Sequence, residues 1–200
     1  MAKSRITVPK VARDRVLAEF NHRCARCGTD RPHIHHIDEN PSNNDLENLI
    51  PLCPNCHLSD QHNPTHPIEP KKLSLLRRYK DPTVLGPQFH ALFRRLSFLD
   101  DAQTADTAAH LEAPASDLVE FVGQLVMGPY YASQIRELVA KPHMLEWDSG
   151  VSPSPGRALR YQREADQRYL AQLRAAYDPV HVLAIELLRF QGWHPKSHAT

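Results

Sequence analysis

The chain has 200 residues, of which 41% are hydrophobic and 24% charged, a composition typical of a folded protein and not of a disordered one. No apolar run approaches the 18 residues of a membrane span, and the basic N-terminal stretch lacks the apolar segment of a secretory signal. We therefore expect no membrane partner. The net charge of +1 by itself indicates no nucleic-acid partner, but residues 1–35 carry eight Lys or Arg side chains against three acidic ones. This excess fits a phosphate backbone or a solvated basic tail.

The N-terminal third predicts short elements around turns. Pro9 can open a helix over about 9–20, since its missing N–H costs nothing in a first turn. A short strand is expected over 33–37, followed by a loop over 38–45 that is rich in turn-forming residues. Apolar residues then lead into a helix from about 54 to 61. Such a unit is too small to be stable by apolar burial alone.

All four cysteines lie in this third, as two Cys-x-x-Cys pairs: Cys24, Cys27, Cys53 and Cys56. Cys-x-x-Cys also serves redox sites, and secreted proteins use cysteines for disulfides, but disulfide frameworks usually spread across the fold. Two close pairs without a secretion signal favour one structural Zn²⁺, held tetrahedrally, closed to water and supplying folding free energy. The expected compartment is the reducing cytoplasm.

The remaining chain predicts helices. The proline-rich stretch 63–70 reads as a linker, so we expect domains at 1–66 and 67–200. A basic amphipathic helix over 71–80 fits DNA phosphates, or an apolar side docked inward with its charges in water. Further helices are expected over 87–99, 117–127 (capped by Ser116), 131–140, 157–177 and 180–190, with a loop or weak helix over 101–116 and Asp178-Pro179 separating the last two.

The cysteine pairs enclose further residues that together resemble the HNH, or ββα-metal, nuclease family, in its subgroup with a four-cysteine zinc site. The resemblance covers roughly residues 10–65 and rests on several elements in order: Cys24-x-x-Cys27, His35-His36-Ile37-Asp38, Asn48-Leu49 and Cys53-Pro-Asn-Cys56-His57. It implies an α+β fold, in which a small zinc-clamped ββα-metal nuclease core precedes a mostly α-helical C-terminal module.

The resemblance also implies roles. His36 would be the general base, because imidazole is poised near neutral pH. His35 and His57 would hold one catalytic divalent cation, Mg²⁺ or Mn²⁺, although histidine also suits Zn²⁺ and Ni²⁺. Asn48 would position the base, since an amide both donates and accepts hydrogen bonds. Adjacent residues of an extended strand face opposite sides, so His35 and His36 act together only if the strand bends or ends there.

Two neighbouring positions leave alternatives open. Asp38 could orient a histidine or touch the metal, but a loop-capping aspartate explains it equally well. Some family members carry another histidine ligand four residues after the last motif histidine, where this chain has Gln61; His62 stands one step beyond and reads as a substitute ligand or an ordinary linker residue.

Three functions follow as hypotheses. The first is a metal-dependent endonuclease acting on DNA, foremost duplex DNA, as a nickase or by double-strand cleavage, in restriction or phage defence as the resemblance suggests. The second is a non-catalytic zinc-knuckle module that binds nucleic acid or protein, which the four cysteines fit equally well. In the third, the helical half carries the function by forming a homo-oligomer or by binding a regulatory protein.

Overall fold

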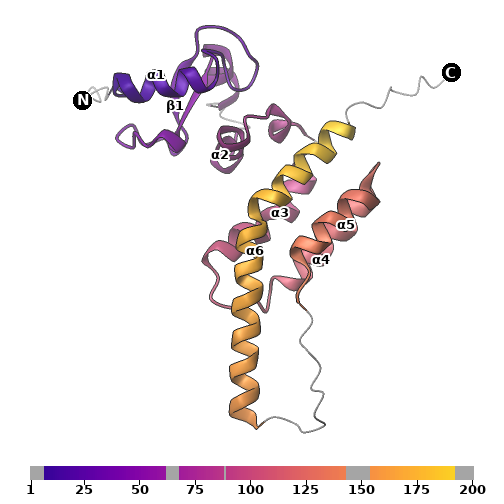
Figure 1. Ribbon diagram of the computed structural model, residues 1–200. Coiled ribbons are helices and arrows are strands. Elements are labelled where there is room, and N and C mark those ends of the chain that lie inside the picture. The colour runs from indigo at the N-terminus through magenta and orange to yellow at the C-terminus, as the bar shows by residue number, and fades with distance from the viewer. Residues whose placement is uncertain (1–6, 62–67, 88, 143–153, 192–200) are drawn as a thin grey trace, which may run out of the picture. The chain divides into compact units, whose positions relative to one another are not determined.

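The computed structural model describes residues 7–61, 68–87, 89–142 and 154–191. The fold is mixed (Figure 1). The two-stranded sheet and the cysteines lie on the N-terminal side, and the described elements of the C-terminal half are helices. The chain divides into two compact units, Met1–Pro87 and Gln88–Thr200, here called the N-terminal unit and the helical unit. None of the described helices combines the length and the apolar character that crossing a bilayer requires.

The N-terminal unit begins with α1 (Lys10–Glu19), which ends where Asn21 and His22 adopt positive φ. Strand β1 (His33–His36) pairs with β2 (Leu49–Leu52) in an antiparallel ladder, in which His35 lies opposite Ile50. The short 3₁₀ helix η1 (Leu46–Asn48) leads into β2, whose four residues are all buried. These elements agree with the helix, strand and loop expected from the sequence.

The expected helix over 54–61 takes an unusual form. Residues 54 and 55 are α-helical, but η2 (Cys56–Gln61) is a π-helix and carries His57 in its first turn. π-Helical turns are rare overall and are frequent at functional sites. The site-bearing segment is thus wound differently from the regular helix that the sequence predicted.

The basic helix expected over 71–80 is α2 (Pro70–Tyr79), followed by the 3₁₀ helix η3 (Pro82–Leu85). The apolar side of this helix docks inward, as one of the two interpretations expected: Leu73, Leu75 and Leu76 are buried. Its charges do not all remain in water, because Lys72 and Arg77 are buried as well. The compact units divide after Pro87, because α2 packs against η1 and β2, whereas the linker composition predicted domains at 1–66 and 67–200.

The helical unit contains α3 (Phe89–Thr104), α4 (Glu112–Gly123), α5 (Gly128–Val139) and α6 (Pro155–Gln191). Helix α6 packs against α3 and α5, and α4 packs against the same two helices. Figure 1 shows α6, in orange and yellow, running along α3 and α5. The core of this unit is a helix-on-helix interface lined by Leu, Val, Ala and aromatic side chains.

Two helix boundaries in this unit were predicted wrongly. Ser116 does not cap a helix but lies within α4, which begins at Glu112; Pro114 is tolerated there because the N–H groups of a first turn need no intrahelical partner. The helices expected over 157–177 and 180–190 are one helix of 37 residues with Pro179 inside it. Buried side chains on both sides of Pro179, among them Leu173 and Val180, outweigh the lost backbone hydrogen bond.

Candidate metal centre and histidine cluster

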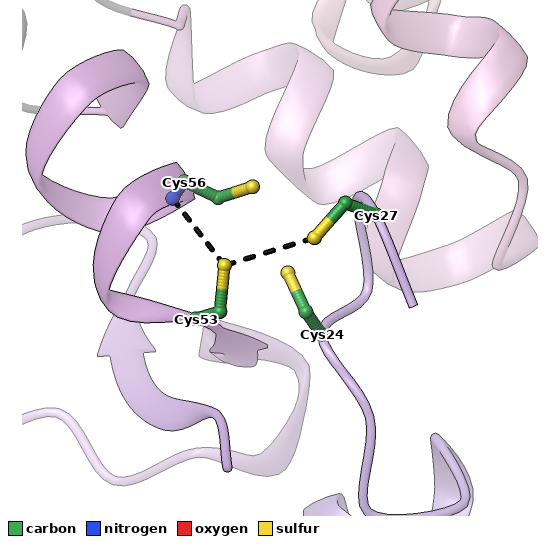
Figure 2. A group of neighbouring side chains, drawn as sticks. All are labelled: Cys24, Cys27, Cys53 and Cys56. Atoms are coloured by element: carbon green, nitrogen blue, oxygen red, sulfur yellow. Dashed lines mark hydrogen bonds between the residues drawn. The ribbon is translucent and has the colours of Figure 1, made fainter. Parts of the chain in front are cut away.

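The four cysteines meet at one point (Figure 2). Cys24 and Cys27 come from the turn after α1, and Cys53 and Cys56 from the segment joining β2 to η2; in the picture their sulfur atoms point toward a common centre. The four Sγ atoms lie within 4.8 Å of one another. Sγ of Cys27 is 3.7 Å from Sγ of Cys53, too far for a disulfide bond. Tetrahedral Zn²⁺ with Zn–S distances of about 2.3 Å would set sulfur atoms about 3.8 Å apart. The cluster therefore fits one structural metal ion.

Local backbone geometry builds this centre. Gly28 has φ +72°, a conformation that side chains disfavour, and its N–H donates to the carbonyl of Cys24 at 2.9 Å to close the first turn. The N–H of Ala25 donates to the carbonyl of Pro51 at 2.8 Å. This bond ties the first cysteine pair to β2, which continues directly into the second pair, so the two pairs are held together by backbone.

The thiols differ in acidity. Sγ of Cys27 lies 3.2 Å from the hydroxyl of Thr29, and this hydrogen bond lowers the pKa of Cys27 to about 6. Burial instead raises the pKa of Cys24 and of Cys56. A metal ion binds thiolates. Its binding must therefore displace the protons that Cys24 and Cys56 carry in the metal-free protein.

His35 and His57 approach each other beside this centre. Nδ1 of His35, on β1, lies 3.1 Å from Nε2 of His57, on η2, and the two rings meet edge to face with centroids 5.0 Å apart. His35 is only 5% exposed. The short distance fits a hydrogen bond between a protonated and an unprotonated nitrogen. It also fits two ligands of one cation, since nitrogens at about 2.1 Å and a right angle lie about 3.0 Å apart.

His36 faces away from His35, as strand alternation requires, and is half-buried. Its Nε2 lies 3.3 Å from Oδ1 of Asn44. His36 and His57 line the same open groove, of about 750 Å³, together with Arg13 and His33. No carboxylate belongs to the lining that the described residues give this groove. His57 is thus related to both histidines of the adjacent pair: its ring contacts His35, and its side chain lines the same groove as His36.

Asn48 braces the loop between the strands. Its Oδ1 accepts the N–H of Asp38 at 3.0 Å, and its Nδ2 donates to Oδ1 of Asp38 at 2.8 Å and to the carbonyl of Asn43 at 2.9 Å. A hydrogen bond from Asn43, followed by those from the Asn40 N–H and the Asn48 amide, lowers the pKa of the Asp38 carboxyl. Asp38 is thus engaged in organising the loop, as the simpler of the two interpretations expected.

Sequence reasoning did not identify Asn44, which reaches the ring of His36, or Arg13, which lines the groove. Asn44 is one of several similar residues in the loop, and nothing in the sequence distinguishes it from Asn40 or Asn43. His62 lies outside the described residues, so the expectation for it remains a prediction.

Comparison of the chain with protein-family models, with curated proteins and with solved structures gave no match. What the structure establishes is a four-cysteine cluster close enough to bind a metal ion, in a unit that combines a two-stranded sheet with helices.

Proposed function

We propose that the protein is a metal-dependent endonuclease of the HNH type that hydrolyses phosphodiester bonds in DNA. The observation that carries the proposal is the place of His57, 3.1 Å from His35 and in the same groove as His36. A non-catalytic zinc knuckle would need the four cysteines but not this set of three histidines, two of which line a groove to which the described residues contribute no carboxylate.

The groove suits a polyanion. Arg13, which is exposed on α1 and ion-paired with Asp14 at 3.2 Å, places a guanidinium at its lining. The lining histidines, His33, His36 and His57, add hydrogen-bond donors. A phosphate backbone lying there would place a phosphodiester beside His36. Duplex DNA is the substrate that we expect first.

In the proposed reaction His36 takes a proton from a water molecule as the oxygen of that water attacks phosphorus. The new P–O bond forms as the bond to the 3′ oxygen breaks, leaving a 5′-phosphate and a 3′ oxygen that takes up a proton. His35 and His57 would hold a divalent cation, Mg²⁺ or Mn²⁺, which supplies neutralising charge for the phosphate and the leaving oxygen. Asn48 holds the loop that follows His36 and so keeps the imidazole in place.

The four-cysteine centre has a separate, structural task. Zn²⁺ at Cys24, Cys27, Cys53 and Cys56 would fix the ends of β2 and η2, and with them His57. All four donors are sulfur, which leaves no open coordination position for a water molecule.

The test is plasmid cleavage by the full-length, zinc-loaded protein with added Mg²⁺, Mn²⁺ or Ni²⁺. Wild type should convert supercoiled plasmid to nicked or linear DNA, and His36→Ala should lose at least about 100-fold of this activity. The control is His22→Asn, which removes an exposed imidazole from the same unit at a positive φ that asparagine tolerates. If wild type binds DNA but never cleaves it with any of these ions, the zinc-knuckle function replaces the nuclease.

A further inference from the structure

We propose that Asn44 fixes the position of the proton on His36, so that Nε2 carries the hydrogen and Nδ1 is the basic nitrogen. The proposal makes Asn44 a positioning residue for the proposed function, and its catalytic consequence depends on the role of His36 as base. The tautomer itself can be measured whether or not the protein cleaves DNA.

The first step of the argument is the contact. Nε2 of His36 lies 3.3 Å from Oδ1 of Asn44. An amide oxygen only accepts hydrogen bonds, so the imidazole nitrogen that faces it must donate. A neutral imidazole carries one N–H, which leaves the lone pair on Nδ1. Among the described residues no hydrogen bond engages Nδ1 of His36, so it is the nitrogen available to a water molecule in the groove.

The second step is that the loop holds Asn44 from both sides. The preceding residue, Asn43, donates from Nδ2 to Oδ2 of Asp38 at 2.7 Å, and its carbonyl accepts Nδ2 of Asn48 at 2.9 Å. On the other side, the N–H of Asp45 donates to Oδ1 of Asn43 at 3.2 Å. The backbone that carries Asn44 is therefore fixed, and its half-buried side chain is directed by that backbone.

The third step is that Asn44 and Asn48 have different hydrogen-bond partners. Among the described residues, the hydrogen bonds of the Asn48 side chain go to Asp38 and Asn43, that is, to the loop. Asn44 is the one of the two that reaches the imidazole. Asn48 thus shapes the loop, and Asn44 uses that shape to select the tautomer. A partner of this kind typically changes activity 10–100-fold when removed, although it touches no substrate.

The experiment is ¹⁵N NMR of the imidazole nitrogens in the full-length, zinc-loaded protein, with ¹⁵N-labelled histidine and a pH at which the ring is neutral. His36→Gln identifies the signals of His36 among the 13 histidines. Wild type should show a protonated Nε2 and an unprotonated Nδ1. Asn44→Ala should give a mixture of tautomers, whereas Asn44→Asp, which keeps an acceptor oxygen, should retain the wild-type pattern.

Asn40→Ala is the matched control, since Asn40 stabilises the same loop through the N–H of Ser42 without contacting the ring. It should leave the tautomer unchanged. In cleavage assays Asn44→Ala should lower kcat about 10–100-fold with KM unchanged, and Asn44→Asp should recover part of the loss.

A wild-type His36 protonated at Nδ1 would overturn the proposal, and so would an Asn44→Ala spectrum identical to wild type. The wild-type measurement stands even if Asn44→Ala does not fold. If the Nε2–H tautomer is present and depends on Asn44 but the protein cleaves no DNA, the positioning by Asn44 holds and the proposed nuclease function fails.

Discussion

Arg77 donates from Nη1 to Oε2 of Glu19 at 2.8 Å, joining α2 to α1 across 58 positions of sequence. The Arg77 side chain is only 3% exposed, and its Nε donates to the carbonyl of Leu46 at 3.1 Å. Its guanidinium also lies over the ring of Phe20. Leu46 begins the turn that carries Asn48. Arg77 therefore connects α2, which follows the cysteine and histidine residues in the chain, to the loop beside His36.

We predict that Arg77→Ala destabilises the N-terminal unit by about 2–3 kcal/mol, because it removes charge-assisted hydrogen bonds and leaves the Leu46 carbonyl without this donor. Arg77→Lys should recover only part of this, since an ammonium cannot form both bonds of the planar fork. The measurement is the urea dependence of zinc release, followed with a chromophoric chelator, because the zinc site reports on this unit.

Arg78→Ala is the control for Arg77, being the next residue of the same helix but exposed. It should change stability by less than about 0.5 kcal/mol. If both variants lower the stability of the N-terminal unit equally, the effect comes from the loss of a positive charge on α2, and the buried contacts of Arg77 do not stabilise the unit.

Burial of Arg77 also explains what the sequence could reveal and what it could not. Spacing alone predicted the cysteine cluster, because two Cys-x-x-Cys pairs have few arrangements in which four sulfurs serve one ion. The basic pattern of α2 was compatible with a solvent-facing or a docked helix, and the choice depends on Glu19, which is remote in sequence. The division of the compact units after Pro87 could not be predicted for the same reason, since local composition marks a linker but not the contacts of the helix that follows it.

The histidine site shows a similar division. The order of residues along the chain identified His35, His36 and His57 as candidates. The fold places His57 3.1 Å from His35 and in the lining of the same groove as His36. The partner of the His36 ring could not be predicted, because Asn40, Asn43 and Asn44 are chemically equivalent in the sequence. Only the hydrogen bonds of the folded loop separate them.

Removing the metal should unfold the N-terminal unit and spare the helical unit. The small sheet cannot persist by apolar burial alone, so the free energy of metal binding, about 10–16 kcal/mol in zinc-finger peptides, is needed for folding. We expect a chelator, or Cys53→Ser, to abolish zinc binding and make residues 7–61 sensitive to protease, while the far-ultraviolet signal of α3 to α6 remains. Ser42→Ala, which leaves the cysteines intact, is the control. Apo protein with a protected N-terminal unit would contradict a structural role for the metal.

Alkaline pH should weaken the helical unit through Tyr169. This side chain is buried, its hydroxyl donates to the Val139 carbonyl at 2.9 Å, and burial raises the pKa of Tyr169 to about 12 from an ordinary value of 10.0. Because the folded-state pKa is the higher one, the stabilisation is fully present below pH 10 and is lost as the pH rises toward 12.

Absorbance near 295 nm should therefore show a late-titrating component that Tyr169→Phe removes. The variant should lose about 1 kcal/mol at neutral pH, and its stability should fall less between pH 10 and 12 than that of wild type. Tyr130→Phe, at an exposed position, is the control. A wild-type protein without a late-titrating tyrosine would contradict this account of the α5–α6 contact.

Pro179 lies within α6, where it removes the N–H that would bond to the carbonyl four residues before it. A proline inside a helix is about 3 kcal/mol less favourable than an alanine. The helix continues through Pro179 because Leu173 and Val180, one on either side of it, are fully buried. We predict that Pro179→Ala raises the thermal stability of the helical unit, by about 1–3 kcal/mol, because it restores the backbone bond without changing the buried face.

The measurement is thermal unfolding followed by circular dichroism, with Pro129→Ala, in the first turn of α5, as a control expected to change little. A loss of stability in Pro179→Ala would mean that the packing of α6 on α3 and α5 depends on a bend at the proline, and that the local cost is recovered in those contacts.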